Sequence, residues 1–269
     1  MNFTSPLVSV TWLFENANHP DLIILDGSLK NAITKEQTIE NKNIPHALRF
    51  DWDKFSDLSN SLPHTMPTSD QFKDAAQELG INSSSIIVVY DREGIYAGPR
   101  VWWMFRAMGF KNCYILDGGL PEWVRKGYNL VNTYDKPRAK GDFVANFNKE
   151  MIVDRQQVLS ALNDKRKRII DARSADRFYG RVAEPRVGLR LGHIPNSVNI
   201  PFETVIFEHK IRTEAELEEI FSPIENKNIQ LIFSCGSGVT ACIDALAATL
   251  IGYENISIYD GSWSEWGMN

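Results

Sequence analysis

The chain alternates between short, continuous apolar runs and longer segments in which apolar residues recur with helical spacing. The runs at 84–91 (SSIIVVYD) and 229–235 (IQLIFSC) lack the apolar and polar alternation of a half-exposed strand. Such runs are typical of strands in a parallel sheet that helices cover on both faces. The apolar segment that opens with Val239 and Thr240 and ends at Gly252 predicts a well-buried helix.

The second half of the chain repeats the pattern of the first. Five pairs of matching residues lie 143 positions apart: Tyr90 and Phe233, Gly109 and Gly252, Asp117 and Asp260, Gly118 and Gly261, Trp123 and Trp266. Further upstream, IILDGS at 23–28 matches IIDARS at 169–174, and IPHALRFDWD at 44–53 matches IPNSVNIPFE at 194–203. The offsets there are 145 and 150, which indicates loop insertions. Each copy alternates strands with helices and ends in an Asp-Gly turn, which predicts a duplicated α/β unit.

The join between the copies is expected where Pro, Gly and charged residues crowd together near 133–150. The sequence therefore predicts an N-terminal domain at 1–140, a linker at 141–150 and a C-terminal domain at 151–269.

Composition and charge exclude several classes of function. A chain of 269 residues with 43% hydrophobic and 23% charged residues is long enough for one large or two medium globular domains. A net charge of -5 offers no attraction for nucleic acid or an anionic membrane, and the basic run KRKR at 165–168 is interpreted as the solvated end of a helix. No apolar run reaches the roughly 18 residues of a membrane helix. The N-terminus lacks a basic stretch before an apolar core, so a cytoplasmic location is expected.

The chain has three cysteines, Cys113, Cys235 and Cys242, without C-x-x-C spacing, which favours neither a disulfide framework nor a structural zinc site. Cys113 and Cys242 are expected in the core. Cys235 differs because Gly-Ser-Gly-Val-Thr follows it, between a buried strand and a helix. Ligands of open α/β sheets bind at this end of the strands. Backbone N–H groups and the helix dipole would stabilise a sulfur anion there, which makes Cys235 the candidate nucleophile, expected largely as the thiolate.

The loop CGSGVT at 235–240, the DGG and DGS turns, and GHIPNSVNIPF at 192–202 resemble the tandem-domain rhodanese-like sulfurtransferases over essentially the whole chain. This resemblance implies two tandem rhodanese-like domains, each a mostly parallel α/β sheet flanked by helices. Within the family, CGSGVT is similar to the loop of the 3-mercaptopyruvate sulfurtransferases, whereas thiosulfate-using rhodaneses carry Arg-Lys in place of Gly236-Ser237. A thiosulfate sulfurtransferase of the same fold is therefore the nearest alternative.

The resemblance also implies an enzyme that passes sulfur through a persulfide on Cys235, with release of pyruvate from 3-mercaptopyruvate. The acceptor would be a thiol or cyanide, with thioredoxin as a candidate partner, and no metal or organic cofactor is expected. The backbone of the loop would cradle the charged sulfur and the substrate, through Gly236, Gly238, Val239 and Thr240.

Two arginines are implied to bind the substrate carboxylate and ketone. The second copy carries an extended loop at 173–195 with five arginines, and the family pattern assigns substrate binding to Arg177 and Arg186. A planar guanidinium matches a 2-oxo acid better than lysine does. The alternative is that these arginines form surface ion pairs with Asp176 and Glu184. Arg173 and His193 are interpreted as structural.

The segment 50–67 (FDWDKFSDLSNSLPHTMP) resembles a family segment whose implied functional members are Asp53 and His64. With Ser237 they would form a serine, histidine, aspartate relay that polarises the substrate. The alternative for His64 is a surface histidine in a Pro-containing loop. The chain departs from the family pattern at Trp52 and at Asn196, where glycine is usual.

The first copy has Arg92 opposite Cys235 and no cysteine between 90 and 98, so the N-terminal domain is expected to be non-catalytic. Two other classes are disfavoured. A cysteine phosphatase needs a Cys-x5-Arg loop, whereas Ala241 holds that sixth position here. A binding module without catalytic activity would have no cysteine in either loop, whereas this chain has Cys235.

Overall fold

The computed structural model describes residues 3–29, 42–224 and 226–268. These residues divide into two compact units. The first comprises the described residues within Met1–Asp57, Met66–Phe147 and Glu208–Lys210, and the second those within Leu58–Thr65, Asn148–Phe207 and Ile211–Asn269. Each unit is built around its own sheet.

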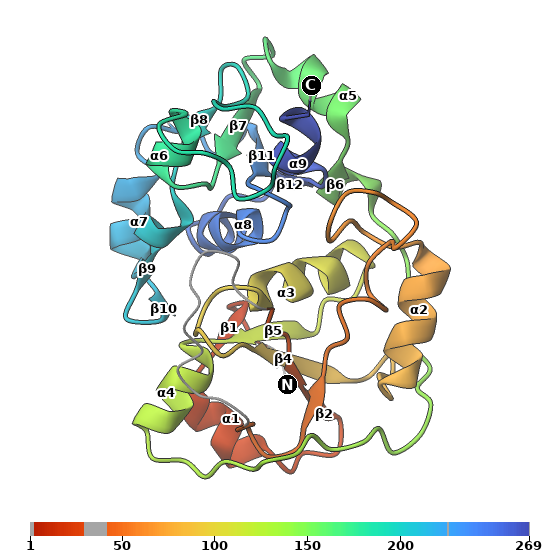
Figure 1. The fold of residues 1–269 in the computed structure, drawn as a ribbon. Helices are drawn as coiled ribbons and strands as arrows, with labels where there is room; N and C mark the ends of the chain where they lie inside the picture. The colour runs from red at the N-terminus through yellow and green to blue at the C-terminus, as the bar shows by residue number, and fades with distance from the viewer. Residues whose placement is uncertain (1–2, 30–41, 225, 269) are drawn as a thin grey trace. The chain divides into compact units, whose positions relative to one another are not determined.

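The first unit contains a five-stranded sheet in the order β1-β5-β4-β2-β3, with every neighbouring pair parallel. Its strands are β1 (Leu7–Val8), β2 (Leu22–Asp26), β3 (Ala47–Arg49), β4 (Ile86–Tyr90) and β5 (Cys113–Leu116). Its helices are α1 (Val10–Asn16), α2 (Ser69–Glu78), α3 (Gly98–Ala107) and α4 (Gly119–Arg125). Helix α3 lies on one side of this sheet, and α1 and α4 lie on the other (Figure 1).

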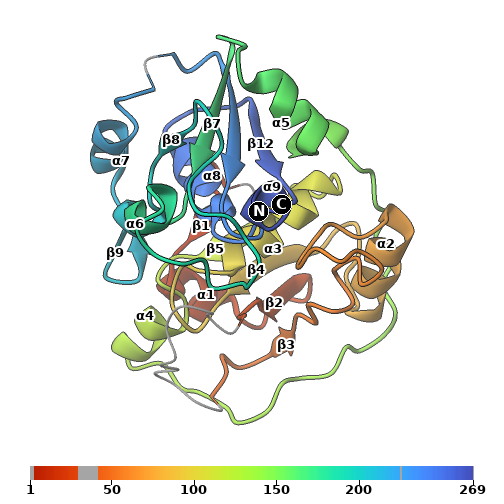
Figure 2. The ribbon, with the colours of Figure 1, turned by 45° about the horizontal axis from the view of Figure 1, so that its top comes forward.

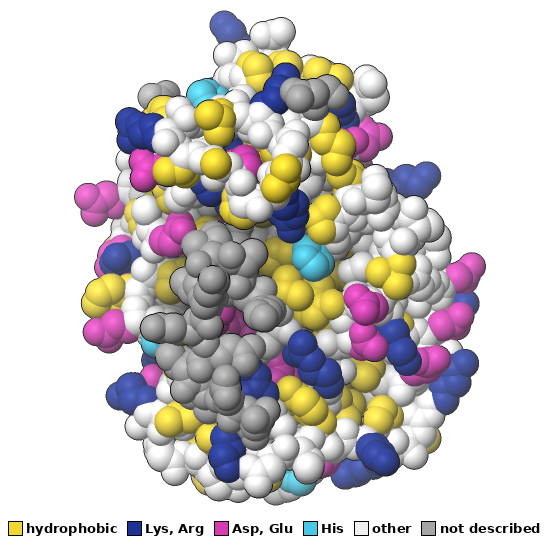
Figure 3. All heavy atoms as spheres, in the orientation of Figure 1, with side chains coloured by type: hydrophobic (Ala, Val, Ile, Leu, Met, Phe, Trp, Pro, Cys, Tyr) yellow, Lys and Arg dark blue, Asp and Glu magenta, His cyan; other side chains and the backbone are white. Residues whose placement is uncertain are grey.

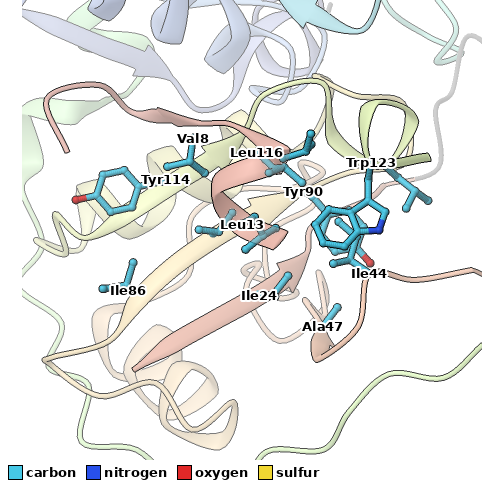
Figure 4. Packing of buried hydrophobic residues seen from close by; sticks show 13 residues of the cluster. Val8, Leu13, Ile24, Ile44, Ala47, Ile86, Tyr90, Tyr114, Leu116 and Trp123 are labelled. Carbon is cyan, nitrogen blue, oxygen red and sulfur yellow. The ribbon is translucent and has the colours of Figure 1, made fainter. Parts of the chain in front are cut away.

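Both faces of the first sheet are buried, as the continuous apolar strands predict. On one face, Leu13 of α1 and Trp123 of α4 pack with Ile24, Val88 and Leu116 of the strands, and Figure 4 shows this cluster. On the other face, an aromatic cluster joins α2 and α3, with ring centroids 5.0 Å apart for Phe72 and Phe105. Burial of this apolar surface is the main stabilising term of such a layered unit.

The second unit repeats this topology with the strand order β6-β12-β11-β7-β8, again wholly parallel. Its strands are β6 (Ile152–Val153), β7 (Lys167–Asp171), β8 (Val198–Asn199), β11 (Gln230–Ser234) and β12 (Ile256–Tyr259). Its helices are α5 (Arg155–Ala161), α6 (Ala175–Phe178), α7 (Glu214–Ile220), α8 (Ala241–Leu250) and α9 (Ser262–Trp266) (Figure 2). Short elements complete the chain: the 3-10 helices η1 (Lys149–Met151) and η2 (Phe202–Val205), and a two-stranded sheet of β9 (Ile206–Phe207) and β10 (Lys210–Ile211). The predicted duplicated α/β fold is confirmed.

Helix α8 is the buried helix that the sequence predicts. The residues from Ala241 to Ala248 are all buried, and Gly252 follows the helix with a φ of 85°. The helix begins at Ala241, with Thr240 as the residue before it, so the predicted start was one to two residues early. Cys113 and Cys242 are buried, as predicted.

The interpretation of the basic run at 165–168 was wrong. Lys165 and Arg166 lie in an exposed turn, and Lys167 begins strand β7 rather than ending a helix. The backbone of Lys167 to Asp171 pairs with β11. This pairing places Lys167 and Arg168 in a strand although their side chains are basic. Asn196, where the family pattern has glycine, has a φ of 60°, a conformation that asparagine tolerates better than most residues.

The surface carries side chains of both charge signs. Lys and Arg side chains are interspersed with Asp and Glu side chains on the face that Figure 3 shows. Among the described residues, no helix is both long enough and apolar enough to span a membrane.

Candidate active site

Cys235 lies directly after the central strand β11, whose neighbours are β12 and β7. The residue is 2% exposed. Its N–H donates to Oγ of Ser262 over 3.2 Å, and that hydroxyl donates to the carbonyl of Tyr259. Ser262 has a φ of 49°, a conformation that disfavours residues other than glycine. Ser262 thus has a strained backbone conformation, and its hydroxyl holds the N–H group at the start of the cysteine loop.

Helix α9 holds the carbonyl groups of the loop. The N–H of Trp263 donates to the carbonyl of Cys235 over 2.9 Å. Both the N–H and the hydroxyl of Ser264 donate to the carbonyl of Gly236, over 2.9 and 2.6 Å. Two carbonyls of the loop are therefore engaged by α9.

The N–H groups of the loop have no such partners. Within the described part of the chain, the backbone N–H groups of residues 236–240 donate to no protein acceptor. They precede the N-terminus of the ten-residue helix α8, whose dipole adds positive potential. A run of unpaired amides before a helix is a site for an anion, as expected for a loop that carries a charged sulfur.

The two predicted arginines converge on this loop. A Cβ atom built at Gly236 would lie 3.1 Å from Nη2 of Arg177 and 3.7 Å from Nη1 of Arg186. Glycine at this position thus leaves room for both guanidinium groups beside Cys235. Ser237, the next residue, is 8% exposed.

The alternative to substrate binding, that the arginines form surface ion pairs with Asp176 and Glu184, is correct only in part for Arg177. Its Nη2 contacts Oε2 of Glu184 at 2.5 Å, but the Glu184 side chain is only 2% exposed, so this is a buried pair. Asp176 pairs instead with Arg181 at 3.4 Å. Among the described residues, Arg186 has no ion pair. The site therefore contains one braced arginine and one whose charge has no carboxylate partner.

Arg173 and His193 are structural, as interpreted. The guanidinium of Arg173 is fully buried, contacts Asp171 at 2.7 Å and Glu184 at 2.8 Å, and lies over the ring of Trp263. Nδ1 of His193 lies 2.9 Å from the carbonyl of Phe178, and the two rings stack. Both side chains brace the extended loop that carries Arg177 and Arg186.

Asp53 and His64 fall in different units. His64 belongs to the segment Leu58–Thr65 of the second unit, the unit of Cys235, and has a φ of 60°. Asp53 is exposed and belongs to the first unit, where its N–H donates to Oδ1 of Asp51. The relay of Asp53, His64 and Ser237 stays a prediction.

In the first unit, the side chain of Asp91 occupies the loop that corresponds to the cysteine loop. Oδ2 of Asp91 accepts hydrogen bonds from the N–H groups of Tyr96, Ala97 and Gly98, over 2.8, 2.9 and 3.0 Å. Asp91 aligns with Ser234 at the 143-residue offset. The amides that are unpaired in the second unit are thus partly occupied by the Asp91 carboxyl group in the first.

Asp91 predicts a pH dependence of stability. Burial raises the pKa of Asp91 to about 6, although the backbone hydrogen bonds oppose this shift. Because the folded-state pKa exceeds the unfolded value of about 4, the contribution of Asp91 is fully present below pH ~4 and is lost as the pH rises through 6. Relative to Asp91→Asn, the wild type should lose about 2 kcal/mol of unfolding free energy between pH 4 and 7. Urea unfolding of both proteins across this range measures it, and a difference that does not change with pH would contradict it.

Three residues of the second unit, Glu184, Ser262 and Asp244, are not predicted from the sequence as parts of the cysteine site. The sequence indicates Glu184 only as a surface partner of the arginines, because its burial depends on tertiary packing. Ser262 occupies the position that Gly119 holds in the first copy, so the repeat offset carried a signal. Asp244 is a lone acid in an otherwise apolar helix, a pattern visible in the sequence.

The second unit combines a parallel α/β fold with a buried cysteine at the end of its central strand and unpaired amides before a helix. These features are typical of α/β proteins that carry out covalent chemistry through a cysteine. The sequence model of the rhodanese-like domain matches residues 9–126 and 154–269. The chain belongs to the rhodanese-like family, with two copies of the domain.

Relatives align over nearly the whole chain. The 3-mercaptopyruvate sulfurtransferase of Escherichia coli (strain K12) is 38% identical, with 98% of this chain and 95% of the relative covered. The thiosulfate sulfurtransferase of Rattus norvegicus is 35% identical, with 97% and 91% covered. Among solved structures, SseA from Escherichia coli has a TM-score of 0.85 at 36% identity and covers 97% of this chain and 100% of its own. The Tum1 protein of Saccharomyces cerevisiae has a TM-score of 0.87 at 28% identity, covering 99% of this chain and 95% of its own.

Proposed function

We propose that the protein is a 3-mercaptopyruvate sulfurtransferase. One observation carries this proposal: the guanidinium groups of Arg177 and Arg186 converge on Gly236, next to Cys235 and its unpaired amides. A 2-oxo acid with a thiol presents a carboxylate and ketone for the arginines and a sulfur for the cysteine. The relatives named 3-mercaptopyruvate sulfurtransferase support the same assignment.

In the first half-reaction, the Cys235 thiolate attacks the thiol sulfur of 3-mercaptopyruvate. A sulfur–sulfur bond forms, the carbon–sulfur bond breaks, and its electron pair leaves with carbon as the enolate of pyruvate. The thiol proton of the substrate ends on that carbon, so pyruvate departs and Cys235 carries an anionic persulfide. Arg177 and Arg186 stabilise the enolate and carboxylate, and the amides of residues 236–240 stabilise the charged sulfur.

In the second half-reaction, a thiol or cyanide attacks the outer sulfur of the persulfide. The bond between the two sulfurs breaks, and Cys235 leaves as the thiolate. Thioredoxin is a candidate acceptor. Ser237, His64 and Asp53 form the proposed relay that polarises the substrate, with Gly236, Gly238, Val239 and Thr240 supplying backbone donors.

The remaining expectations belong to the same proposal. The domain of residues 151–269 is catalytic, residues 141–150 are the linker, and the domain of residues 1–140 forms no persulfide itself. Asp53 and His64 come from the sequence of that N-terminal domain, although the segment that contains His64 packs as part of the second unit. A cytoplasmic location is proposed from the sequence. A thiosulfate sulfurtransferase is the alternative, and turnover measured side by side with 3-mercaptopyruvate and thiosulfate distinguishes the two; a preference for thiosulfate would overturn the assignment.

The loop is expected to set the choice of donor. Replacing Gly236-Ser237 by Arg-Lys should lower kcat/KM for 3-mercaptopyruvate about ten- to a hundredfold and raise it for thiosulfate, whose leaving sulfite needs cationic stabilisation. An arginine at 236 would also press against Arg177, since even a Cβ there lies 3.1 Å from its Nη2. Steady-state rates with both donors measure this.

Ser237→Ala alone is the matched control for the loop replacement. It removes the hydroxyl without adding charge, so it should lower turnover of 3-mercaptopyruvate without raising turnover of thiosulfate. If the Arg-Lys loop leaves the ratio of the two donors unchanged, the loop does not determine specificity.

A further inference from the structure

Asp244 is a carboxylic acid inside the buried helix α8, nine residues after Cys235. The residue is 0% exposed, and neither of its carboxyl oxygens has a hydrogen-bond partner among the described residues. A buried carboxylate without a hydrogen bond or a counter-charge is strongly disfavoured. The sequence thus keeps an acid in a place where an apolar residue would pack at lower free energy.

Helix α8 packs against β11, which leads into Cys235, and against η2, while Asp171 of β7 pairs in register with Ser234 of β11. Among the described residues, the charged groups that act on Asp244 are all acidic. They are Cys235 at the end of β11, Glu203 on η2 and Asp171 at the end of β7. Helix α8 also packs against β12 and α7, but within the described residues these two elements place no charged group that acts on Asp244. Burial first, and then the negative charge of Cys235, Glu203 and Asp171, raise the pKa of Asp244 well above its ordinary value.

The neighbouring carboxylates are partly compensated by arginines, whereas Asp244 is not. Asp171 is paired with Arg173 at 2.7 Å. Partial burial raises the pKa of Glu203, and the charge of Arg177 acts in the opposite direction. Among these carboxyl groups, Asp244 is therefore the one whose negative charge no arginine offsets.

We propose that Asp244 is a positioning residue for Cys235: as the neutral acid it permits a negative charge on the cysteine sulfur, and as the carboxylate it opposes that charge. The inference rests on the proposed function in one respect only, that Cys235 carries the charge in the reaction. Two like charges that interact in this way titrate as a coupled pair. Neutral Asp244 favours departure of the Cys235 thiolate in the second half-reaction, and ionised Asp244 slows it.

The test compares wild type with Asp244→Asn, whose amide imitates the neutral acid in size and charge. The first readout needs no sulfur donor: the rate of Cys235 alkylation by iodoacetamide between pH 6 and 10, followed by mass spectrometry. Wild type should show a second rise at high pH, because ionised Asp244 makes the thiolate more basic and more nucleophilic. Asp244→Asn should show a single rise.

The second readout is kcat/KM for the acceptor, which reports the second half-reaction, expressed as the ratio of the value in Asp244→Asn to the value in wild type. This ratio should be near one at pH 6 and increase roughly tenfold at high pH. Asp244→Leu, which is also uncharged and of similar size, should behave as Asp244→Asn and guards against a folding defect in either variant. Asp91→Asn, which removes the buried acid of the first unit, is the matched control and should leave the Cys235 profile unchanged.

The outcomes are distinguishable. Identical single-step alkylation profiles in wild type and both Asp244 variants, with folded proteins, would overturn the inference. If the alkylation profiles differ as expected but no protein forms pyruvate from 3-mercaptopyruvate, the role of Asp244 holds and the proposed function fails.

Discussion

Replacing Cys235 with serine is expected to abolish sulfur transfer, with a loss on the order of 10⁴-fold or more in kcat. A serine hydroxyl is a poor nucleophile toward sulfur without strong activation, and it cannot hold a persulfide. The fold should survive, because the N–H and carbonyl of residue 235 make the contacts with Ser262 and Trp263, and the backbone is unchanged.

Mass spectrometry separates this role from that of the other two cysteines. Wild type treated with 3-mercaptopyruvate should gain one sulfur atom, and the gain should map to the peptide that contains Cys235. Cys113→Ser and Cys242→Ser are the controls: both residues are buried in the core, and both variants should still gain the sulfur on Cys235 if they fold. Sulfur found on Cys113 or Cys242 in wild type would show that the nucleophile is assigned to the wrong residue.

Arg177→Ala and Arg186→Ala should each lower kcat/KM for 3-mercaptopyruvate about ten- to a hundredfold. A hydrogen bond to a charged group contributes about 1.5 to 3 kcal/mol, which corresponds to this range when it is lost in the transition state. Removal of Arg177 also leaves Glu184 beside the loop with Arg173 as its remaining partner, so repulsion of the anionic substrate adds to the loss. Arg186 has no ion pair among the described residues, so its effect should come from substrate contact alone.

Arg181→Ala is the matched control in the same extended loop. Its side chain is 65% exposed and pairs with Asp176 at 3.4 Å, so kcat/KM should stay within about twofold of wild type, as is usual for an exposed ion pair. Conservative Arg177→Lys and Arg186→Lys variants should recover only part of the loss, because lysine retains the charge without the planar fork. If both alanine variants turn over 3-mercaptopyruvate as wild type does, these arginines do not bind the substrate.

The repeat predicted much of the fold because both copies obey the same packing rules. Runs such as IIVVY at 86–90 can be buried on both faces only in a helix-covered sheet, and both copies form such strands. The failure at 165–168 has the opposite cause. Four consecutive basic residues are typical of a solvated surface. However, Ile169 and Ile170, which follow them, are buried in β7, and Lys167 and Arg168 pair with β11 as part of the same strand. Local composition does not predict such strand pairing.

The chemistry of the cysteine loop could also be predicted, since two glycines beside a cysteine between a buried strand and a helix have no packing reason. What the sequence by itself determined was therefore the duplicated α/β unit, the single candidate nucleophile and the arginine-rich loop, because periodicity and residue type are local properties. The tertiary structure alone decided that Ser262 and Ser264 hold the loop, that Glu184 is buried between two arginines, and that Asp244 is buried without a hydrogen-bond partner among the described residues. These contacts join residues that lie far apart in the chain or on different elements, and only packing brings their atoms within reach.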